Sequence, residues 1–224
     1  MSLTVEVGGR PLLLLAQRAA FLPDVHTLLV ADAHLGKAQT YRRLGVPVPG
    51  GTTAQNLQTL TLLVERHAAR AIVFLGDLLH SRHARSPATL TTFDAWRERH
   101  PALTLTLVRG NHDLHAGDPP ARWRIDVVDE PWSVGTLALC HQPRTVEARY
   151  TIAGHVHPAA VVGSGIDRLR LPCFHFGTQV GLLPAFGDFT GLHVVSAQPG
   201  DRVFVVASDS VRALPVRADP TLFA

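Results

Sequence analysis

The chain has 224 residues, of which 46% are hydrophobic and 17% charged, and its formal net charge is +3. This composition excludes an intrinsically disordered protein, and the length suffices for one large domain with a sizeable core. No apolar run approaches the roughly 20 residues that span a bilayer, which excludes a helical membrane protein. The mild positive charge is compatible with phosphate-bearing substrates but does not demonstrate them.

The N-terminal segment and the cysteines predict a cytoplasmic protein. The apolar segment Pro11–Ala16 is too short for a signal peptide, and the polar residues Gln17 and Arg18 follow it at once. Cys140 and Cys173 are the only cysteines, and both lie in apolar runs. We therefore expect two buried thiols, with a disulfide as the alternative.

The first part of the chain has the pattern of β-strands. Thr4–Val7 and Pro11–Leu15 flank a Gly-Gly turn and predict a hairpin. Ala19–Leu22 predicts a further short strand. Thr27–Ala31 is continuously apolar, which is typical of a buried central strand.

The next segment, Gly36–Pro49, is polar and basic and ends in prolines. Two interpretations stay open for it, a mobile surface loop and a loop or lid on the substrate side. Beyond it, apolar residues at helical spacing predict one helix that Thr52 or Thr53 caps and a second over Pro87–His100.

Further strands alternate with these helices. Ala71–Leu75 and Thr104–Arg109 complete a β-α-β-α-β order with a polar residue after each strand. The second half predicts mainly short strands, at 125–128, 132–134, 136–140, 150–153, 159–162, 168–174, 191–196, 203–207 and 211–215. Leu183–Gly191 has no evident chemistry and is interpreted as structural. Without a linker or a repeat, residues 1–224 are expected to form a single α/β (α+β) domain of two packed sheets and flanking helices.

Metal-binding side chains follow five apolar runs of the chain, where open α/β sheets build their sites. They are Asp32 and His34, Asp77, Asn111, His141, and His155 and His157. Such a mixture of nitrogen and oxygen ligands suits Mn, Fe, Zn or Ni, and argues against a thiolate site or a calcium site. Two metals a few ångströms apart need a bridging ligand, and the two oxygens of Asp77 suit that role.

The motif Gly110-Asn-His-Asp113 adds two residues with a different expected role. His112 stands beside a ligand and is placed to face the substrate and not the metal. Asp113 is expected to orient the His112 imidazole, as carboxylates often do, with loop capping as the alternative.

These motifs, in this order, resemble the calcineurin-like metallophosphoesterase superfamily over residues 32–157. A narrower resemblance, to the bacterial ligase-associated DNA damage response endonuclease group (PdeM), extends over nearly the full chain. It rests on Ala31–Lys37, His155–Pro158, Leu171–Phe174 and Leu183–Gly191. The resemblance implies a four-layer sandwich of two mixed β-sheets flanked by helices, with no separate cap domain.

The resemblance also implies roles for the site residues. Asp32, His34 and His157 would hold one divalent metal, Asn111, His141 and His155 the other, and Asp77 would bridge them. His112 would be the general acid, or a donor to the phosphoryl oxygens. Manganese is the expected metal. The sequence departs from many members after Gly76-Asp77, where His80 and Arg82 are expected either to face the substrate or to be structural.

Two classes of function remain open. One is a metal-dependent DNA endonuclease or phosphodiesterase of DNA repair, with a repair ligase and helicase as partners by family resemblance. The other is a phosphoesterase for nucleotides or a lipid-linked pyrophosphate; a non-enzymatic scaffold is disfavoured because His112 is present. DNA binding requires a basic track to the site. Its candidates are Lys37, Arg42, Arg43, Arg82, Arg85 and Arg144, and Arg144 is equally well a solvated side chain.

Overall fold

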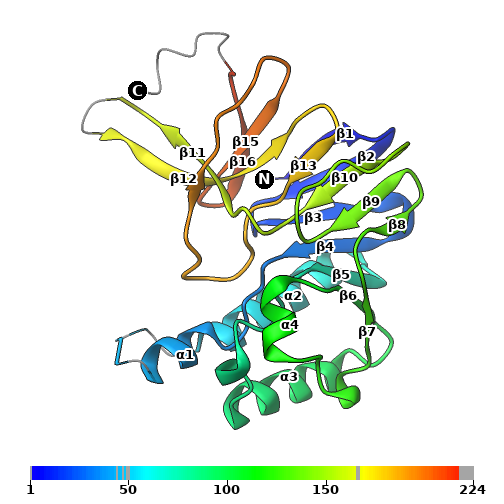
Figure 1. Ribbon diagram of the computed structural model, residues 1–224, viewed down its shortest axis with the longest axis vertical. Helices are drawn as coiled ribbons and strands as arrows, with labels where there is room; N and C mark the ends of the chain where they lie inside the picture. Colours follow the sequence, from blue (N-terminus) through cyan, green and yellow to red (C-terminus); the bar gives the residue numbers. More distant parts are fainter. Residues whose placement is uncertain (1, 44, 47, 49–50, 165–166, 217–224) are drawn as a thin grey trace.

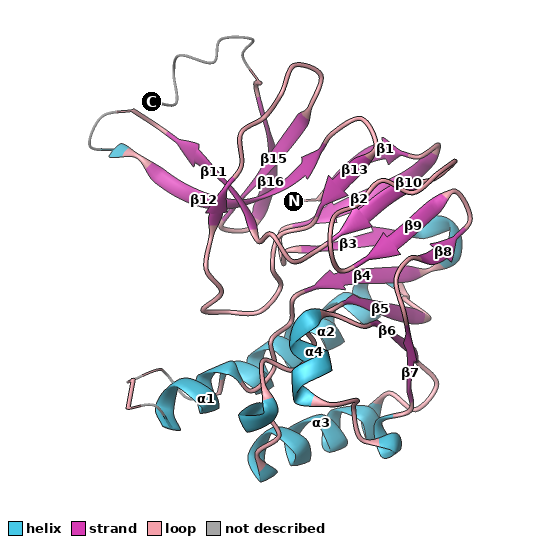
Figure 2. Cartoon of the chain, in the orientation of Figure 1, coloured by secondary structure: helices cyan, strands magenta, loops and turns pink. Residues whose placement is uncertain are grey.

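The computed structural model describes residues 2–43, 45, 46, 48, 51–164 and 167–216, and Figure 1 shows how they are arranged. Two mixed β-sheets pack on one another, and helices flank them, as Figure 2 shows by secondary structure. The predicted α/β sandwich is therefore confirmed. No helix of the described residues is long and apolar enough to cross a membrane.

The first sheet contains seven strands in chain order. They are β1 (Leu3–Val7), β2 (Arg10–Leu15), β3 (Ala19–Leu22), β4 (Thr27–Ala31), β5 (Ala71–Leu75), β6 (Thr104–Val108) and β7 (Ile125–Val128). Strands β1 to β4 are antiparallel, and β4 to β7 are parallel. The predicted hairpin and the predicted buried strand at Thr27–Ala31 are both confirmed.

Within the described part of the chain, the second sheet contains nine strands, and only part of it is parallel. Its strands are β8 (Trp132–Val134), β9 (Leu137–Cys140), β10 (Tyr150–Ala153), β11 (Pro158–Val162), β12 (Leu169–Phe176), β13 (Val180–Leu182), β14 (His193–Val194), β15 (Arg202–Ala207) and β16 (Ser210–Leu214). Apolar side chains of both sheets, among them Leu12, Leu29, Leu139, Ile152 and Phe174, form one shared core. Both cysteines are buried and free, as expected.

The helices are α1 (Lys37–Arg43), α2 (Thr52–His67), α3 (Pro87–Arg99) and α4 (Asn111–Ala116), with the 3-10 turns η1 (Pro23–Val25), η2 (Arg82–Ala84) and η3 (Ala121–Trp123). Helices α2 and α3 pack on the face of the first sheet that points away from the second, where Leu60, Phe93 and Trp96 join a core with Phe74. The two predicted helices are thus confirmed, because their apolar stripes face this core.

Two local predictions are wrong. Lys37–Arg43 form helix α1 and not a loop, while residues 44, 47, 49 and 50 of that segment lie outside the described residues. The predicted threonine cap of α2 is also absent. Gly51 is the N-cap residue and has no side chain to bond the helix, and the hydroxyl of Thr53 accepts a hydrogen bond from the Gly36 amide at 3.1 Å.

Candidate metal centre

The carboxyl ends of strands from both sheets meet at the candidate site. In the first sheet Ala31 pairs with Leu75, and Leu75 pairs with Val108, so these three parallel strands end level with one another. In the second sheet Cys140 pairs with Ala153. The polar residues that follow each of these strand ends are therefore brought together, as the sequence predicts.

The buried carboxylates of Asp32 and Asp77 each use one oxygen to accept a hydrogen bond from a backbone amide. Asp32 Oδ2 accepts from the His155 amide at 2.8 Å, and Asp77 Oδ1 accepts from the His112 amide at 2.9 Å. Asp32 Oδ1 is buried and has no hydrogen-bond partner among the described residues. A buried carboxylate oxygen without a partner is costly, which is what a bound cation relieves.

Histidine nitrogens surround these carboxylates. His157 Nε2 lies 3.6 Å from Asp32 Oδ1, and His34 Nε2 lies 3.8 Å from Asp77 Oδ2. Within the described residues, three groups of three side chains could each hold an ion. They are Asp32 with His34 and His157, Asp32 with Asp77 and His141, and His34 with His80 and His112. The first group is one of the two ligand sets expected from the sequence.

His141 connects the second set of expected ligands. Its Nε2 lies 2.8 Å from Asn111 Oδ1 and 3.0 Å from His155 Nδ1, and all three atoms can present a lone pair to a metal. Its Nδ1 lies 3.1 Å from the Leu75 carbonyl. Because a carbonyl oxygen only accepts, Nδ1 carries the proton, and Nε2 keeps the lone pair that a metal ligand requires.

The backbone is strained where the candidate ligands sit. Positive φ angles, which side chains other than glycine rarely adopt, occur at Asp32, His34, Asp77, His155 and His157. Such strain costs about 1–3 kcal/mol per residue and clusters at functional sites. The local turns therefore cost stability, and they direct these five side chains toward the candidate site.

Three glycines of the ligand motifs lie directly against candidate ligand side chains. A Cβ atom on Gly76 would lie 2.2 Å from His141 Nδ1, on Gly110 2.5 Å from Asp77 Oδ1, and on Gly154 2.6 Å from Asp32 Oδ2. Each of these distances is a severe clash. The glycines thus let a ligand side chain from another loop lie directly against the backbone.

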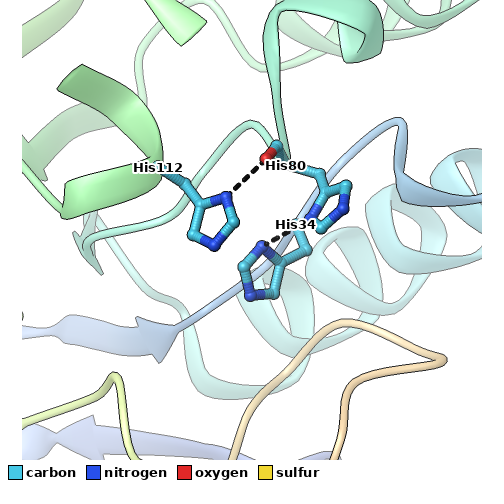
Figure 3. A group of neighbouring side chains, drawn as sticks. All are labelled: His34, His80 and His112. Atoms are coloured by element: carbon cyan, nitrogen blue, oxygen red, sulfur yellow. Dashed lines mark hydrogen bonds between the residues drawn. The ribbon is translucent and has the colours of Figure 1, made fainter. Parts of the chain in front are cut away.

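His112 belongs to a cluster of three imidazoles with His34 and His80, which Figure 3 shows. The rings of His80 and His112 stack with centroids 5.2 Å apart. His112 Nδ1 donates to the His80 carbonyl oxygen at 2.6 Å. The His112 side chain is 39% exposed, and its Nε2 lies 3.9 Å from Asp77 Oδ2. This geometry leaves Nε2 available to a ligand.

The expectation that Asp113 orients His112 is wrong. Its carboxylate accepts hydrogen bonds from four backbone amides, those of Gly110, Asp77, Leu78 and Leu79, at 2.7–3.4 Å. It thereby fixes the loop that carries Asp77. The ring of His112 is instead held by the carbonyl oxygen of His80.

Burial decides the protonation of several side chains in the site. Burial first, and then the positive charge of Lys37, lowers the pKa of His34 and brings that of His80 to about 4. Burial also raises the pKa of Asp77 and brings that of Asp113 to about 6. Neutral imidazoles are the form that binds metal ions.

Three of the six basic side chains predicted to form a DNA track have partners inside the chain, namely Arg42, Arg85 and Arg144. Arg85 donates to the carbonyls of Ala116 and Asp118, and Arg42 to that of Val48. Arg82 is exposed in η2, and Lys37 is buried beside the site. The side chain of Arg43 lies outside the described residues.

Arg144 pairs with Glu130, a residue that the sequence analysis missed. Glu130 also accepts from the amide of His141 at 2.6 Å and from that of Gln142 at 2.9 Å. It therefore fixes the loop that carries a candidate ligand. A single glutamate before a proline gives no signal of such a role in the sequence, because its partners are distant along the chain.

Comparison with known proteins identifies this arrangement. The sequence profile of the calcineurin-like phosphoesterase family matches residues 18–177. The chain belongs to this family. It is a metallophosphoesterase, and the family implies a dinuclear divalent metal site. The orphaned oxygen of Asp32 and the converging lone pairs around His141 fit such a site.

Two solved structures resemble this metallophosphoesterase. One is the Pseudomonas putida nuclease MPE, which is 43% identical, with a TM-score of 0.85 over 96% of this chain and 100% of that one. The other is Yfce, a phosphoesterase from E. coli, at 13% identity and a TM-score of 0.43 over 85% of this chain and 99% of that one. No curated protein matches the sequence.

Proposed function

We propose that this metallophosphoesterase is a nuclease that hydrolyses phosphodiester bonds of DNA. The observation that carries the proposal is the 43% identity to a Pseudomonas putida nuclease over nearly the whole of both chains. We further propose a single domain over residues 1–224, because the sequence contains no linker or repeat. The two free, buried cysteines support a cytoplasmic location, and the family resemblance alone supports a role in DNA repair. We propose manganese as the metal because it suits the mixture of nitrogen and oxygen ligands.

The proposed ligands follow the geometry of the centre. Asp32, His34 and His157 bind one ion, and Asn111, His141 and His155 bind the other. Asp77 lies between both sets, 3.8 Å from His34 Nε2 and 3.5 Å from His141 Nε2, which supports its role as the bridge. When bound, two such ions lower the pKa of a coordinated water and stabilise charge on the phosphoryl group.

His112 is the proposed general acid. Its Nδ1 proton is committed to the His80 carbonyl, so Nε2 is the atom that gives a proton to the leaving oxygen. His80 positions that ring both through its carbonyl and by stacking against it. Arg144 is not proposed as a substrate contact, because its guanidinium pairs with Glu130. Arg82 is exposed and stays a candidate contact for the DNA backbone.

The test is hydrolysis of bis-p-nitrophenyl phosphate and of a labelled single-stranded DNA, each with added Mn²⁺ and with EDTA. Cleavage of both only in the presence of metal supports the nuclease. Cleavage of the small diester alone would instead favour a small-molecule phosphoesterase. No cleavage of either by a protein that holds two metals would favour a scaffold.

A bridging-ligand variant tests the metal assignment in the same assay. Asp77→Asn is expected to abolish cleavage and to reduce the bound metal below two ions per chain, measured by atomic spectroscopy. The matched control is Asp126→Asn, the same change at an exposed position of β7. Full activity of Asp77→Asn with two metals retained would remove the bridging role.

A further inference from the structure

The sequence contains a single lysine, Lys37, among its 21 lysine and arginine residues. It is the first residue of α1 and lies three positions after the candidate ligand His34, whose carbonyl accepts from the Lys37 amide at 3.1 Å. Unlike most lysines it is buried, with 8% of its surface exposed. The one side-chain ammonium group of the sequence is therefore enclosed next to the candidate metal centre.

The Lys37 ammonium has no hydrogen bond or ion pair among the described residues. Its Nζ lies over the ring of Tyr41, 5.9 Å from the ring centroid. The Tyr41 ring is 6.0 Å from the His80 ring, and His80 stacks on His112. Lys37 thus lies on the side of the site where the proposed general acid stands.

The charge of Lys37 acts on the centre from this position. Burial lowers its own pKa, whereas the carboxylates of Asp32 and Asp77 act in the opposite direction. Those two carboxylates are near enough to influence the ammonium, yet neither forms an ion pair with it. Bound divalent ions would neutralise both carboxylates, and the buried ammonium would then face positive charge alone.

A buried charge is stable only if it is paired and hydrogen-bonded. The group that can satisfy an ammonium beside a dinuclear centre is an anion that enters with the substrate. An ammonium offers three donors in a compact head, which suits a phosphoryl oxygen. Arg82 is another basic residue of this region, but it is exposed and so has water as its partner.

We propose that the Lys37 ammonium binds a non-bridging oxygen of the phosphate group that the site accepts. This inference rests on the proposed function only in taking a phosphate as the ligand. It makes Lys37 a substrate-binding residue beside the metal centre. The phosphoryl group is then held between the centre, the His112 imidazole and the ammonium.

The first test measures binding of inorganic phosphate to the metal-loaded protein by calorimetry. Lys37→Met keeps the length of the side chain and removes the charge, and we expect the affinity to fall about 10- to 100-fold with both metals retained. Lys37→Arg is expected to recover part of that loss. Arg66→Met, the same loss of charge at an exposed position of α2, is the control and should bind like the wild type.

Phosphate affinity of Lys37→Met within twofold of the wild type, with two metals bound, would overturn the proposal. Loss of the metals in Lys37→Met would also count against it, because it would mean that Lys37 balances the charge of Asp32 and Asp77. Neither measurement requires turnover. A wild-type protein that binds phosphate through Lys37 but cleaves no DNA would remove the proposed function and leave this inference standing.

A second measurement uses the unaltered protein, because a chain with one lysine gives one side-chain product with an amine-specific acetylating reagent. Saturating inorganic phosphate should slow acetylation of Lys37, read by mass spectrometry, while the α-amino group serves as the internal reference. Equal labelling of Lys37 with and without phosphate would overturn the proposal. So would no labelling at all, since an ammonium that meets the substrate must be reachable from solvent.

Discussion

At the scale of single residues, His112 is held from one side and open on the other. The His80 carbonyl fixes Nδ1, and 39% of the side chain is exposed. His112→Ala is therefore expected to keep both metals and to lose turnover of DNA by about 10²–10⁴-fold, the usual contribution of a general acid. Metal stoichiometry and the cleavage rate are measured on the same preparation. An unchanged rate would mean that another group protonates the leaving oxygen.

Asp113 is adjacent to His112 in sequence but has a different role, because it holds the backbone of a loop. Its carboxylate binds four backbone amides, and an asparagine would turn a donor toward some of them. Asp113→Asn is expected to lower the free energy of unfolding by about 2–4 kcal/mol. The measurement is denaturant unfolding at pH 8, above the pKa of about 6 that burial gives this carboxyl group.

The control for Asp113→Asn is His112→Ala, which removes a partly exposed ring and should unfold close to the wild type. If Asp113→Asn were as stable as the wild type but inactive, Asp113 would act on the chemistry and not on the loop. That outcome would contradict the role that the four amide bonds indicate.

At the scale of elements, the segment Leu183–Gly191 supports the loop that carries Asp32 and His34. Its Phe186 amide donates to the Ala31 carbonyl at 2.8 Å, and its Gly187 amide donates to the Asp32 carbonyl at 3.1 Å. A Cβ atom on Gly187 would lie 2.4 Å from the Ala33 carbonyl oxygen. The segment has no side-chain chemistry in the site, so its interpretation as structural agrees with these contacts.

Gly187→Ala therefore tests the link between this segment and the metal centre. The backbone has to separate, and we expect a loss of about 1–3 kcal/mol in the free energy of unfolding together with weaker metal binding. Gly191→Ala is the matched control, because a Cβ atom there meets nothing within 4 Å. Thermal unfolding and metal titration report the two effects. Equal behaviour of the two variants would mean that the segment adapts without moving the ligand loop.

The elements that the sequence predicts are those with a clear apolar period. Helices α2 and α3 have such a stripe, and strands β4 to β6 are apolar runs. Helix α1 escaped prediction because Lys37–Arg43 is polar and basic and has no continuous apolar face. Strand β13 was missed because it has three residues with a glycine at its centre.

At the scale of the whole molecule, the candidate site could be predicted because each ligand follows a strand. The ends of parallel strands meet at one edge wherever the sheet order is as expected. The contacts that hold the site could not be predicted, because they join distant segments. Glu130 reaches the loop of His141, and Asp113 reaches the loop of Asp77. Such pairings depend on the register between segments, which no local pattern records.

The reactivity of the two thiols can be used to measure opening of the fold, because both are buried in the second sheet. Burial raises the pKa of Cys140 to about 11 and that of Cys173 to about 12. The thiolate is the reactive form, so at pH 8 both thiols are almost entirely protonated in the folded chain. Neither thiol should react with a disulfide reagent in the native protein, whereas both should react at once in denaturant, where the pKa returns to its ordinary value.

The rate of thiol labelling then measures how often the sheet opens. If the two-sheet sandwich opens as a single unit, both cysteines should be labelled with the same rate constant. That rate constant should rise with denaturant as the unfolding rate does. Rapid labelling of Cys140 alone would show that the strand before His141 opens locally. Since Glu130 fixes the turn after that strand, Glu130→Gln is the variant expected to speed the labelling of Cys140 over that of Cys173.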